Sequence, residues 1–242
     1  MYLVPEFEKF FPVTDGKFEV RYPSVTRILG ALSDKSFLEE WIARVGQEEA
    51  DRISKESTEF GEALHSRIEN FLMGEPLEEL KPGRLSFTFD SLLGKLRFKK
   101  VKPIGLEVPL QSHVVKVQGR CDFVGYVDGE LVILDWKTSK KPRMKSWNDS
   151  YFIQAAAYAL CFKEMTGILP KKLCIVICGE QFCQWETEDL LPWVQRLKET
   201  IREYYQQYPD GFHRISDDHC GNLTTCDVPS TPTVSAEPTG NV

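Results

Sequence analysis

The chain has 242 residues, 42% of them hydrophobic and 27% charged, which excludes a wholly disordered chain and a collagen-like repeat. No apolar run approaches the ~20 residues that cross a bilayer, so neither an integral membrane protein nor a membrane partner is expected. The formal net charge of −6 argues against a protein that holds nucleic acid by its overall charge. No signal or transit peptide is recognisable, and seven cysteines, an odd number, indicate free thiols. We therefore expect a cytoplasmic protein, of a bacterium or of a phage-infected host.

Basic residues nevertheless gather in two segments. Residues 38–80 carry twelve acidic and four basic side chains, whereas residues 81–103 carry seven basic and one acidic. Residues 137–145 carry five basic and no acidic side chains. Each run could be an ordinary solvated face. Two basic segments in an acidic chain also allow a polyanion to be held in one local channel.

The hydrophobic pattern predicts a succession of elements. Alternation around Asp15–Gly16 predicts a hairpin within the first 23 residues. Ser24 is a suitable N-cap for the helix that follows, and Pro76 and Pro82–Gly83 interrupt the first half of the chain. In chain order we predict helices over 25–45 and 58–73, a basic amphipathic segment over 85–100, strands over 104–137, a helix over 151–165, a strand over 173–178 and a helix over 189–208.

This order predicts an α/β (α+β) protein with a central mixed sheet flanked by helices. A single domain is expected over residues 1–215, with a helical N-terminal part at about 22–100 and a core at about 101–208. Residues 216–242 are rich in Pro, Thr, Ser, Gly and Asn, so we expect a disordered tail. The histidine and two cysteines of this tail are too few and too loosely spaced to predict a zinc site.

A predicted hairpin brings two aspartates together. Asp128–Gly129 between two β-prone runs is a strong signal for a two-residue turn. Counting outward from that turn, Asp122 lies opposite Asp135, with Cβ atoms only ~4.5–5.5 Å apart on the same face of the sheet. The two-residue period of a strand places Lys137 on this face as well, next to Asp135 and opposite Arg120.

Such a set has two interpretations. Adjacent carboxylates repel each other unless a cation lies between them, and oxygen ligands at this separation suit Mg²⁺. The lysine could then hold a water or neutralise charge on a phosphate. Alternatively, the aspartates are ordinary strand-end residues paired with Arg120 and Lys137. The next helix favours the first interpretation, because Gln154 and Tyr158 share one of its faces and its alanines let it approach the sheet.

These motifs resemble a known family, the PD-(D/E)XK nuclease superfamily in its RecB-type branch. The resemblance covers about residues 22–208, and Cys121 stands where the name of the superfamily has proline. The run from Pro23 to Leu29 is further similar to the mitochondrial genome maintenance exonucleases and their phage and bacterial relatives. The motifs that carry the resemblance are Gly61-x-x-x-His65, Gly119-x-x-Asp122, Asp135-x-Lys137 and Gln154-x-x-x-Tyr158.

The resemblance implies a restriction-endonuclease-like core and a Mg²⁺- or Mn²⁺-dependent exodeoxyribonuclease. Its substrate would be DNA, preferably single-stranded or with single-stranded ends, in replication, recombination or repair. The alternatives are a structure-specific endonuclease on the same core and a catalytically silent DNA-binding module.

The resemblance also implies roles for individual residues. Lys137 would act on the attacking water, and Glu107 could reach the site or merely pair with a basic neighbour. The implied metal ligands are His65, Asp122, Asp135 and the backbone carbonyl of Trp136. The implied catalytic residues are Asp122, Asp135, Lys137, Gln154 and Tyr158. The implied DNA-binding residues are Ser24, Thr26, Lys99, Lys100, Arg120 and Lys140.

Overall fold

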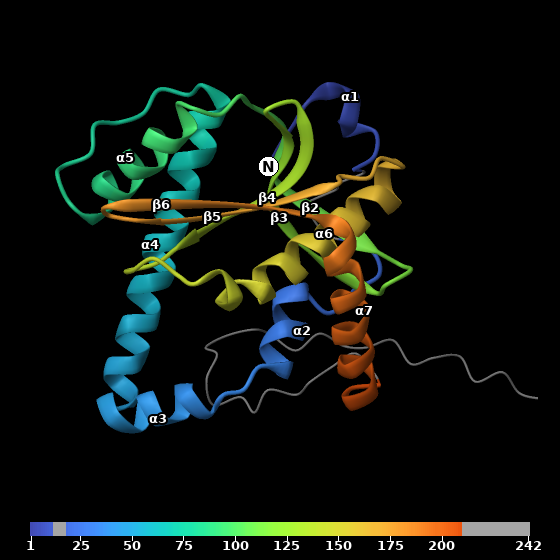
Figure 1. Cartoon of the computed structure of the whole chain (residues 1–242), viewed down its shortest axis with the longest axis horizontal. Helices are drawn as coiled ribbons and strands as arrows, with labels where there is room; N and C mark the ends of the chain where they lie inside the picture. The colour runs from blue at the N-terminus through green and yellow to red at the C-terminus, as the bar shows by residue number, and fades with distance from the viewer. Residues whose placement is uncertain (12–17, 210–242) are drawn as a thin grey trace, which may run out of the picture. The chain divides into compact units, whose positions relative to one another are not determined.

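One mixed sheet lies at the centre of the computed structural model, which describes residues 1–11 and 18–209 (Figure 1). Within these residues six strands follow one another in the order in which they occur in the chain. All neighbouring strands are antiparallel except β4 and β5, which are parallel. The predicted central mixed sheet is therefore confirmed. The strands are Tyr2–Leu3 (β1), Val101–Ser112 (β2), Val117–Val127 (β3), Glu130–Thr138 (β4), Lys172–Gly179 (β5) and Phe182–Asp189 (β6).

Helices cover both faces of this sheet. In Figure 1 the sheet is seen edge-on, with α5 on one side and with α2, α6 and α7 on the other. None of the helices in the described residues has the length and apolarity needed to cross a membrane. The helices are Pro5–Glu8 (α1), Val25–Leu32 (α2), Ser36–Val45 (α3), Gln47–Met73 (α4), Arg84–Leu96 (α5), Asp149–Thr166 (α6) and Leu190–Gln207 (α7), with a 3₁₀ turn at Lys145–Trp147.

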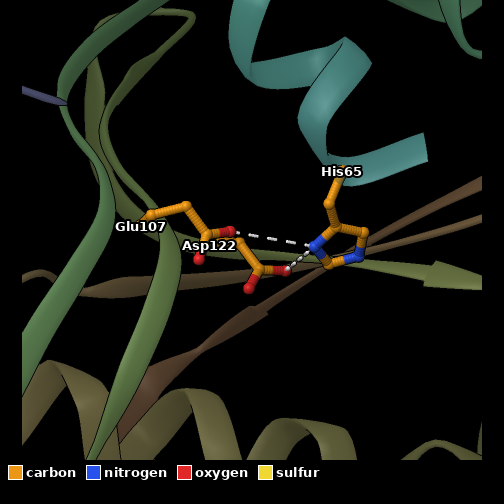
Figure 2. A group of neighbouring side chains, drawn as sticks. All are labelled: His65, Glu107 and Asp122. Atoms are coloured by element: carbon orange, nitrogen blue, oxygen red, sulfur yellow. Dashed lines mark ion pairs between the residues drawn. The ribbon is translucent and has the colours of Figure 1, made fainter. Parts of the chain in front are cut away.

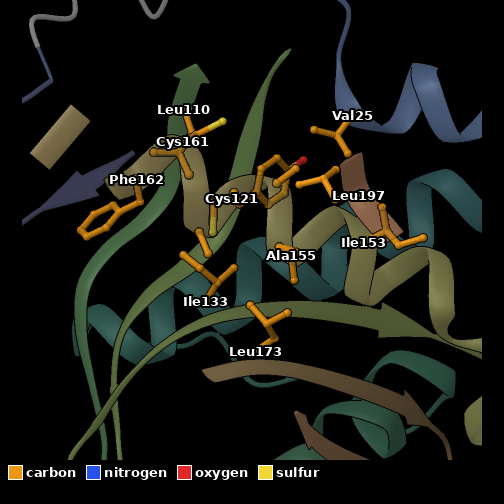
Figure 3. Packing of buried hydrophobic residues seen from close by; sticks show 14 of the residues in the cluster. Val25, Leu110, Cys121, Ile133, Ile153, Ala155, Cys161, Phe162, Leu173 and Leu197 are labelled. Atoms are coloured by element: carbon orange, nitrogen blue, oxygen red, sulfur yellow. The ribbon is translucent and has the colours of Figure 1, made fainter. Parts of the chain in front are cut away.

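Each face of the sheet has its own hydrophobic core. On one face, Ile133 and Leu173 belong to the same cluster as Ala155 of α6 (Figure 3). The alanines of this helix are completely buried, so α6 approaches the sheet closely, as predicted. On the other face, Leu64 of α4 and Phe89 of α5 pack against strand residues. The helix α6 also provides the crossover that parallel pairing of β4 and β5 requires.

The turn between β3 and β4 has the geometry that its sequence predicts. Asp128 and Gly129 both have positive φ, 52° and 89°, as a type I′ turn requires. Backbone pairing runs outward from Val127–Glu130 to Phe123–Leu134, so the predicted register is confirmed for these pairs, but the ladder does not extend to the predicted pairs Asp122–Asp135 and Arg120–Lys137. The ladder ends there, and Asp122 and Asp135 occupy the next position outward.

Some predicted element boundaries are wrong. The helix expected over 25–45 is two helices, because the side chain of Asp34 accepts a hydrogen bond of 2.9 Å from Ser36 N–H and a new helix starts there. The helix expected over 58–73 begins earlier, at Gln47. The Ser24 hydroxyl does accept a hydrogen bond from Arg27 N–H, so the predicted N-cap is confirmed.

The N-terminal prediction fails in its described part. Residues 2–3 pair with β2, and residues 5–8 are helical from a proline at the first helical position. Within residues 1–11, therefore, the expected arm of an N-terminal hairpin is not formed. The turn at Asp15–Gly16 lies outside the described residues, and so does the predicted tail at 216–242 with its histidine and cysteines.

Candidate active site

Three side chains from three elements meet where β3 and β4 part (Figure 2). His65 comes from α4, Glu107 from β2 and Asp122 from β3. The Nδ1 atom of His65 lies 3.6 Å from Oδ2 of Asp122 and 3.9 Å from Oε1 of Glu107. One possible ligand atom of each residue lies within 4.8 Å of those of the other two. We refer to these three residues as the His65 cluster.

A backbone irregularity turns the two acidic side chains of the cluster toward each other. Glu107 has a φ of 53°, in the left-handed region that residues with a side chain rarely adopt. Its neighbours Leu106 and Val108 pack on opposite faces of the sheet, although an unbroken strand would place them on the same face. The neighbours of Asp122 in β3 change face in the same way. Backbone strain of this kind concentrates at functional sites.

The β3–β4 ladder ends before Trp136, so the backbone of Trp136 is free of the β3 backbone and contacts the cluster instead. Its N–H donates to Oδ2 of Asp122 at 2.9 Å, and its carbonyl lies 3.0 Å from Nε2 of His65. A neutral His65 that donates from Nε2 to this carbonyl keeps the lone pair of Nδ1 directed at Asp122 and Glu107. Here the Trp136 carbonyl, predicted as a metal ligand, contacts His65, a second predicted ligand.

Negative charge in the His65 cluster exceeds what its neighbours neutralise. Burial and, to a smaller extent, the nearby charge of Asp135 raise the pKa of Asp122 to about 7, against the opposing effects of His65 and Lys137. Burial lowers the pKa of His65, but Glu107, Asp122 and Asp135 outweigh burial and raise it. The group therefore attracts positive charge. Two carboxylates and an imidazole are suitable donors for a divalent cation such as Mg²⁺ or Mn²⁺, so the residues fit the metal that the resemblance implies.

A second set of polar residues lies on the α6 side of the same strand. The Nζ atom of Lys137 is 2.5 Å from Oδ2 of Asp135 and donates to Oε1 of Gln154 at 3.3 Å. The amide of Gln154 donates to the hydroxyl of Tyr158 at 3.1 Å. Burial lowers the pKa of Lys137, but Asp135 and Asp122 raise it more, so the lysine is held as a cation. We refer to these four residues as the Lys137 chain.

The structure assigns two of the predicted site residues to other roles than the sequence suggested. Asp135, predicted as a metal ligand, is 2% exposed and forms an ion pair with Lys137. Glu107, for which the sequence left two roles open, lies in the His65 cluster instead, and its Oε2 is also 3.8 Å from Arg120. The two sets remain one site electrostatically, because the charge of Asp135 acts on the pKa of both Asp122 and His65.

Gly119 has a physical reason to be part of the motif. A Cβ atom at this position would lie 2.6 Å from Cε1 and 2.8 Å from the hydroxyl oxygen of Tyr158. Any larger residue would displace the tyrosine ring from β3. The glycine thus lets Tyr158 lie against the sheet and hold Gln154, and through Gln154 the end of Lys137.

The predicted DNA-binding residues do not all lie at the site. Ser24, which also bonds to the hydroxyl of Thr26, and Arg120 line a pocket of about 280 Å³ next to the His65 cluster. Lys140 is exposed two residues after the end of β4. These residues bring positive charge and hydrogen-bond donors to the same end of the sheet as Asp122.

Lys99 and Lys100 lie elsewhere. Lys99 pairs with Asp128 at 2.7 Å, and Lys100 N–H donates to the same carboxylate at 3.0 Å. Asp128 is in the β3–β4 turn, six residues from Asp122 along the chain, so at ~3.4 Å per strand residue the two lysines are roughly 20 Å from the cluster. The structure therefore does not bring these two predicted DNA contacts to the site.

Tyr151 and Arg143 are site residues that sequence reasoning missed. The Nζ atom of Lys137 lies 5.0 Å from the centroid of the Tyr151 ring, and Arg143 donates to the Tyr151 hydroxyl at 3.2 Å. Helical spacing could have indicated Tyr151, because it precedes Gln154 by three residues and so shares the face of Gln154 and Tyr158. No local signal marks Arg143.

Acidic side chains, an imidazole and a half-buried lysine at the opened end of a mixed sheet fit a metal-dependent hydrolase. The profile of one family, the PD-(D/E)XK nuclease superfamily, matches residues 36–230. Because this match covers most of the sequence, the chain belongs to the PD-(D/E)XK nuclease superfamily.

Individual relatives are distant. The chain is 24% identical over 193 residues to mitochondrial genome maintenance exonuclease 1 of Homo sapiens, an alignment that covers 67% of this chain and 56% of the human protein. The chain thus spans little more than half the length of this curated relative. The solved structure of SSO0001 is 14% identical and covers 84% of this chain and 88% of its own, with a TM-score of 0.40. The structure of an alkaline exonuclease from Laribacter hongkongensis is 12% identical, and the match covers 84% of this chain and 98% of the exonuclease chain, with a TM-score of 0.28.

Proposed function

We propose that the protein is a Mg²⁺- or Mn²⁺-dependent exodeoxyribonuclease that acts on single-stranded DNA or on single-stranded ends, in replication, recombination or repair. The observation that carries this proposal is the juxtaposition of the His65 cluster, which has an excess of negative charge, with a lysine held as a cation. Membership of a nuclease superfamily supports the reaction class, and the name of the human relative supports an exonuclease.

The His65 cluster would hold the metal ion. His65, Glu107 and Asp122 provide one donor atom each, and Asp135 lies close enough to act on their charge. A bound divalent ion would stabilise charge on the scissile phosphate and lower the pKa of a water molecule. The ligands must be deprotonated to hold it, so metal binding and proton release from Asp122 and His65 are coupled.

Lys137 would act as a donor and not as a proton acceptor. Asp135 forms an ion pair with its ammonium group and Gln154 accepts a hydrogen bond from it, and its raised pKa keeps the group protonated at neutral pH. A cation of this kind stabilises the negative charge that develops on a phosphate during hydrolysis, or orients the attacking water through a hydrogen bond. Gln154 and Tyr158 hold Lys137 in place.

The DNA strand would approach the site past Arg120 and Lys140. Arg120 lies between the pocket beside Ser24 and the carboxylate of Glu107. Guanidinium and ammonium groups contact phosphates irrespective of base sequence, so these contacts position a strand without selecting one.

Labelled DNA tests the proposal. The purified protein is incubated with 5′- or 3′-labelled DNA, single- or double-stranded, linear or circular, with Mg²⁺, with Mn²⁺ or with EDTA. We expect degradation of linear single strands with either metal and none in EDTA. Intact circles should be spared, and blunt duplexes should be cut slowly because unpairing costs ~1.4 kcal/mol per base-pair step.

The other outcomes identify the alternatives. Rapid digestion of covalently closed single-stranded circles would show an endonuclease. Binding of DNA without cleavage in either metal would show a silent binding module. Undiminished cleavage in EDTA would contradict the metal site, and the Asp122→Asn variant serves as the matched control for contaminating nucleases.

A further inference from the structure

An exposed tryptophan lies in the connection between β4 and α6. Trp147 is 58% exposed and Met144, three residues earlier, is 57% exposed. The preceding segment, residues 137–145, carries five basic side chains and no acidic one. A large aromatic side chain in water beside concentrated positive charge combines the two features of single-stranded nucleic-acid binding, stacking on bases and attraction of phosphates.

The tryptophan is held in place by its backbone. The guanidinium of Arg143 donates to the carbonyl oxygen of Trp147 at 3.0 Å. Arg143 is itself attached to β6, because its N–H donates to the Gln184 side chain at 2.7 Å and its carbonyl accepts from the Gln184 amide at 2.9 Å. The next residue, Asn148, is completely buried and donates to Glu186 of β6 at 3.0 Å. Trp147 is thus exposed from a well-anchored segment.

The same arginine connects Trp147 to the Lys137 chain. Arg143 donates from its other terminal nitrogen to the Tyr151 hydroxyl at 3.2 Å, and the Tyr151 ring lies 5.0 Å from Nζ of Lys137. One guanidinium therefore bridges the backbone of Trp147 and the tyrosine beside the proposed catalytic lysine. A strand whose phosphate lies at Lys137 would pass close to Trp147.

We propose that Trp147 is a stacking platform for a nucleobase of the DNA strand, near the nucleotide whose phosphate is hydrolysed. This inference rests on the proposed function and adds a positioning residue to it. Stacking accepts every base because each has an aromatic face, so Trp147 would fix the strand without reading its sequence. The exposed Lys140 and Lys141 would contact neighbouring phosphates, whereas Lys145 is held by Glu188.

A combination of protein variants and abasic DNA tests the platform. Binding of fluorescent single strands is measured in Ca²⁺ by anisotropy, with a series of oligonucleotides that each lack one base. The wild type should lose affinity when one particular base is missing. Trp147→Ala should bind the intact strand roughly 5- to 100-fold more weakly and should not respond to the loss of that base. Trp147→Phe should keep most of the affinity and the response.

Phe98 provides a matched control. It is 85% exposed, and it adjoins Lys99 and Lys100 near the β3–β4 turn, away from the site. Phe98→Ala should bind as the wild type does. Thermal unfolding checks that each variant is folded, which the exposure of both side chains leads us to expect.

The outcomes separate this inference from the function on which it rests. If the wild type cleaves DNA but itself responds equally to every missing base, or if Trp147→Ala binds as tightly as the wild type or still responds to the loss of the same base, the platform is refuted and the exonuclease proposal stands. If the wild type neither binds nor cleaves DNA, both are refuted.

Discussion

The His65 cluster and the Lys137 chain lie on either side of one strand end and solve the problem of buried charge in opposite ways. In the Lys137 chain, Asp135 faces a cation of the protein itself, 2.5 Å away. In the His65 cluster, Asp122 and Glu107 face a histidine that is neutral unless it binds a proton, and the pKa of Asp122 is raised to about 7 by burial and by Asp135. One half of the site is neutralised from within, and the other half requires a cation from solution.

The largest effect on activity should follow from replacing Lys137, the cation that the protein itself provides. Lys137→Met is expected to lower kcat by roughly 10²–10³-fold, as the loss of one preorganised donor does. DNA binding in Ca²⁺ should persist, because the metal site remains. Lys99→Met, a replacement at the far end of the sheet, should keep a normal kcat in the same single-turnover assay. A near-normal kcat for Lys137→Met would show that its role is assigned wrongly.

The two aspartates should differ in their effect on stability. Asp135→Ala leaves the half-buried Lys137 without its ion-pair partner and with only Gln154 to accept from it, which is expected to lower the free energy of unfolding by ~1–3 kcal/mol. Asp122→Ala removes a buried charge that repels Asp135, so its loss should be much smaller. Urea unfolding in EDTA measures both. Equal losses for the two variants would contradict the distinction between the halves of the site.

The His65 cluster should make the metal-free protein less stable as the pH rises. The folded-state pKa of Asp122 is raised to about 7 from 3.8, and that of His65 is raised above 6.5. In both cases the folded state binds more protons than the unfolded state, so metal-free protein should lose stability as the pH rises from 6 to 8, most steeply below pH 7, where the folded state still holds the Asp122 proton and the unfolded state does not.

Urea unfolding at intervals from pH 6 to pH 8 checks this expectation. Saturating Mg²⁺ should reverse the loss, since it replaces the protons, and Asp122→Asn in EDTA should show a shallower fall than the wild type. A metal-free wild type that becomes more stable across this interval would contradict the charge excess assigned to the cluster.

The smallest effects should come from the exposed lysines. Lys140→Ala is expected to weaken DNA binding equally for all sequences and to reduce the slope of log affinity against log salt by about 1. Lys99→Ala should change neither, because Lys99 pairs with Asp128 at the other end of β3. Anisotropy titrations between low and moderate salt measure both slopes. A larger effect for Lys99 would place the DNA path along α5.

Sequence reasoning succeeded where the determinants are local. The Asp128–Gly129 turn sets the register that brings Asp122 and Asp135 to adjacent positions, and helical spacing places Gln154 and Tyr158 on one face. These features depend on the nearest residues, so the sequence predicts them without knowledge of the rest of the fold.

Sequence reasoning failed where distant segments or an irregular backbone determine the position of a residue. The role of Glu107 depends on a positive φ that no neighbouring residue signals. Lys99 and Lys100 are far from the site because α5 ends beside the β3–β4 turn, which charge patterning cannot reveal. Strand β6 was missed because its residues are half-exposed on both faces and lack a clear alternation.

Titration of Mn²⁺ into the metal-free protein, followed by calorimetry, tests the central claim most directly. The wild type should bind the ion at the His65 cluster with release of protons near pH 7. Asp122→Asn and Glu107→Gln should lose this binding, whereas Lys137→Met, in the other half of the site, should keep it. Undiminished binding by Asp122→Asn, or its loss in Lys137→Met alone, would contradict a metal site built from His65, Glu107 and Asp122.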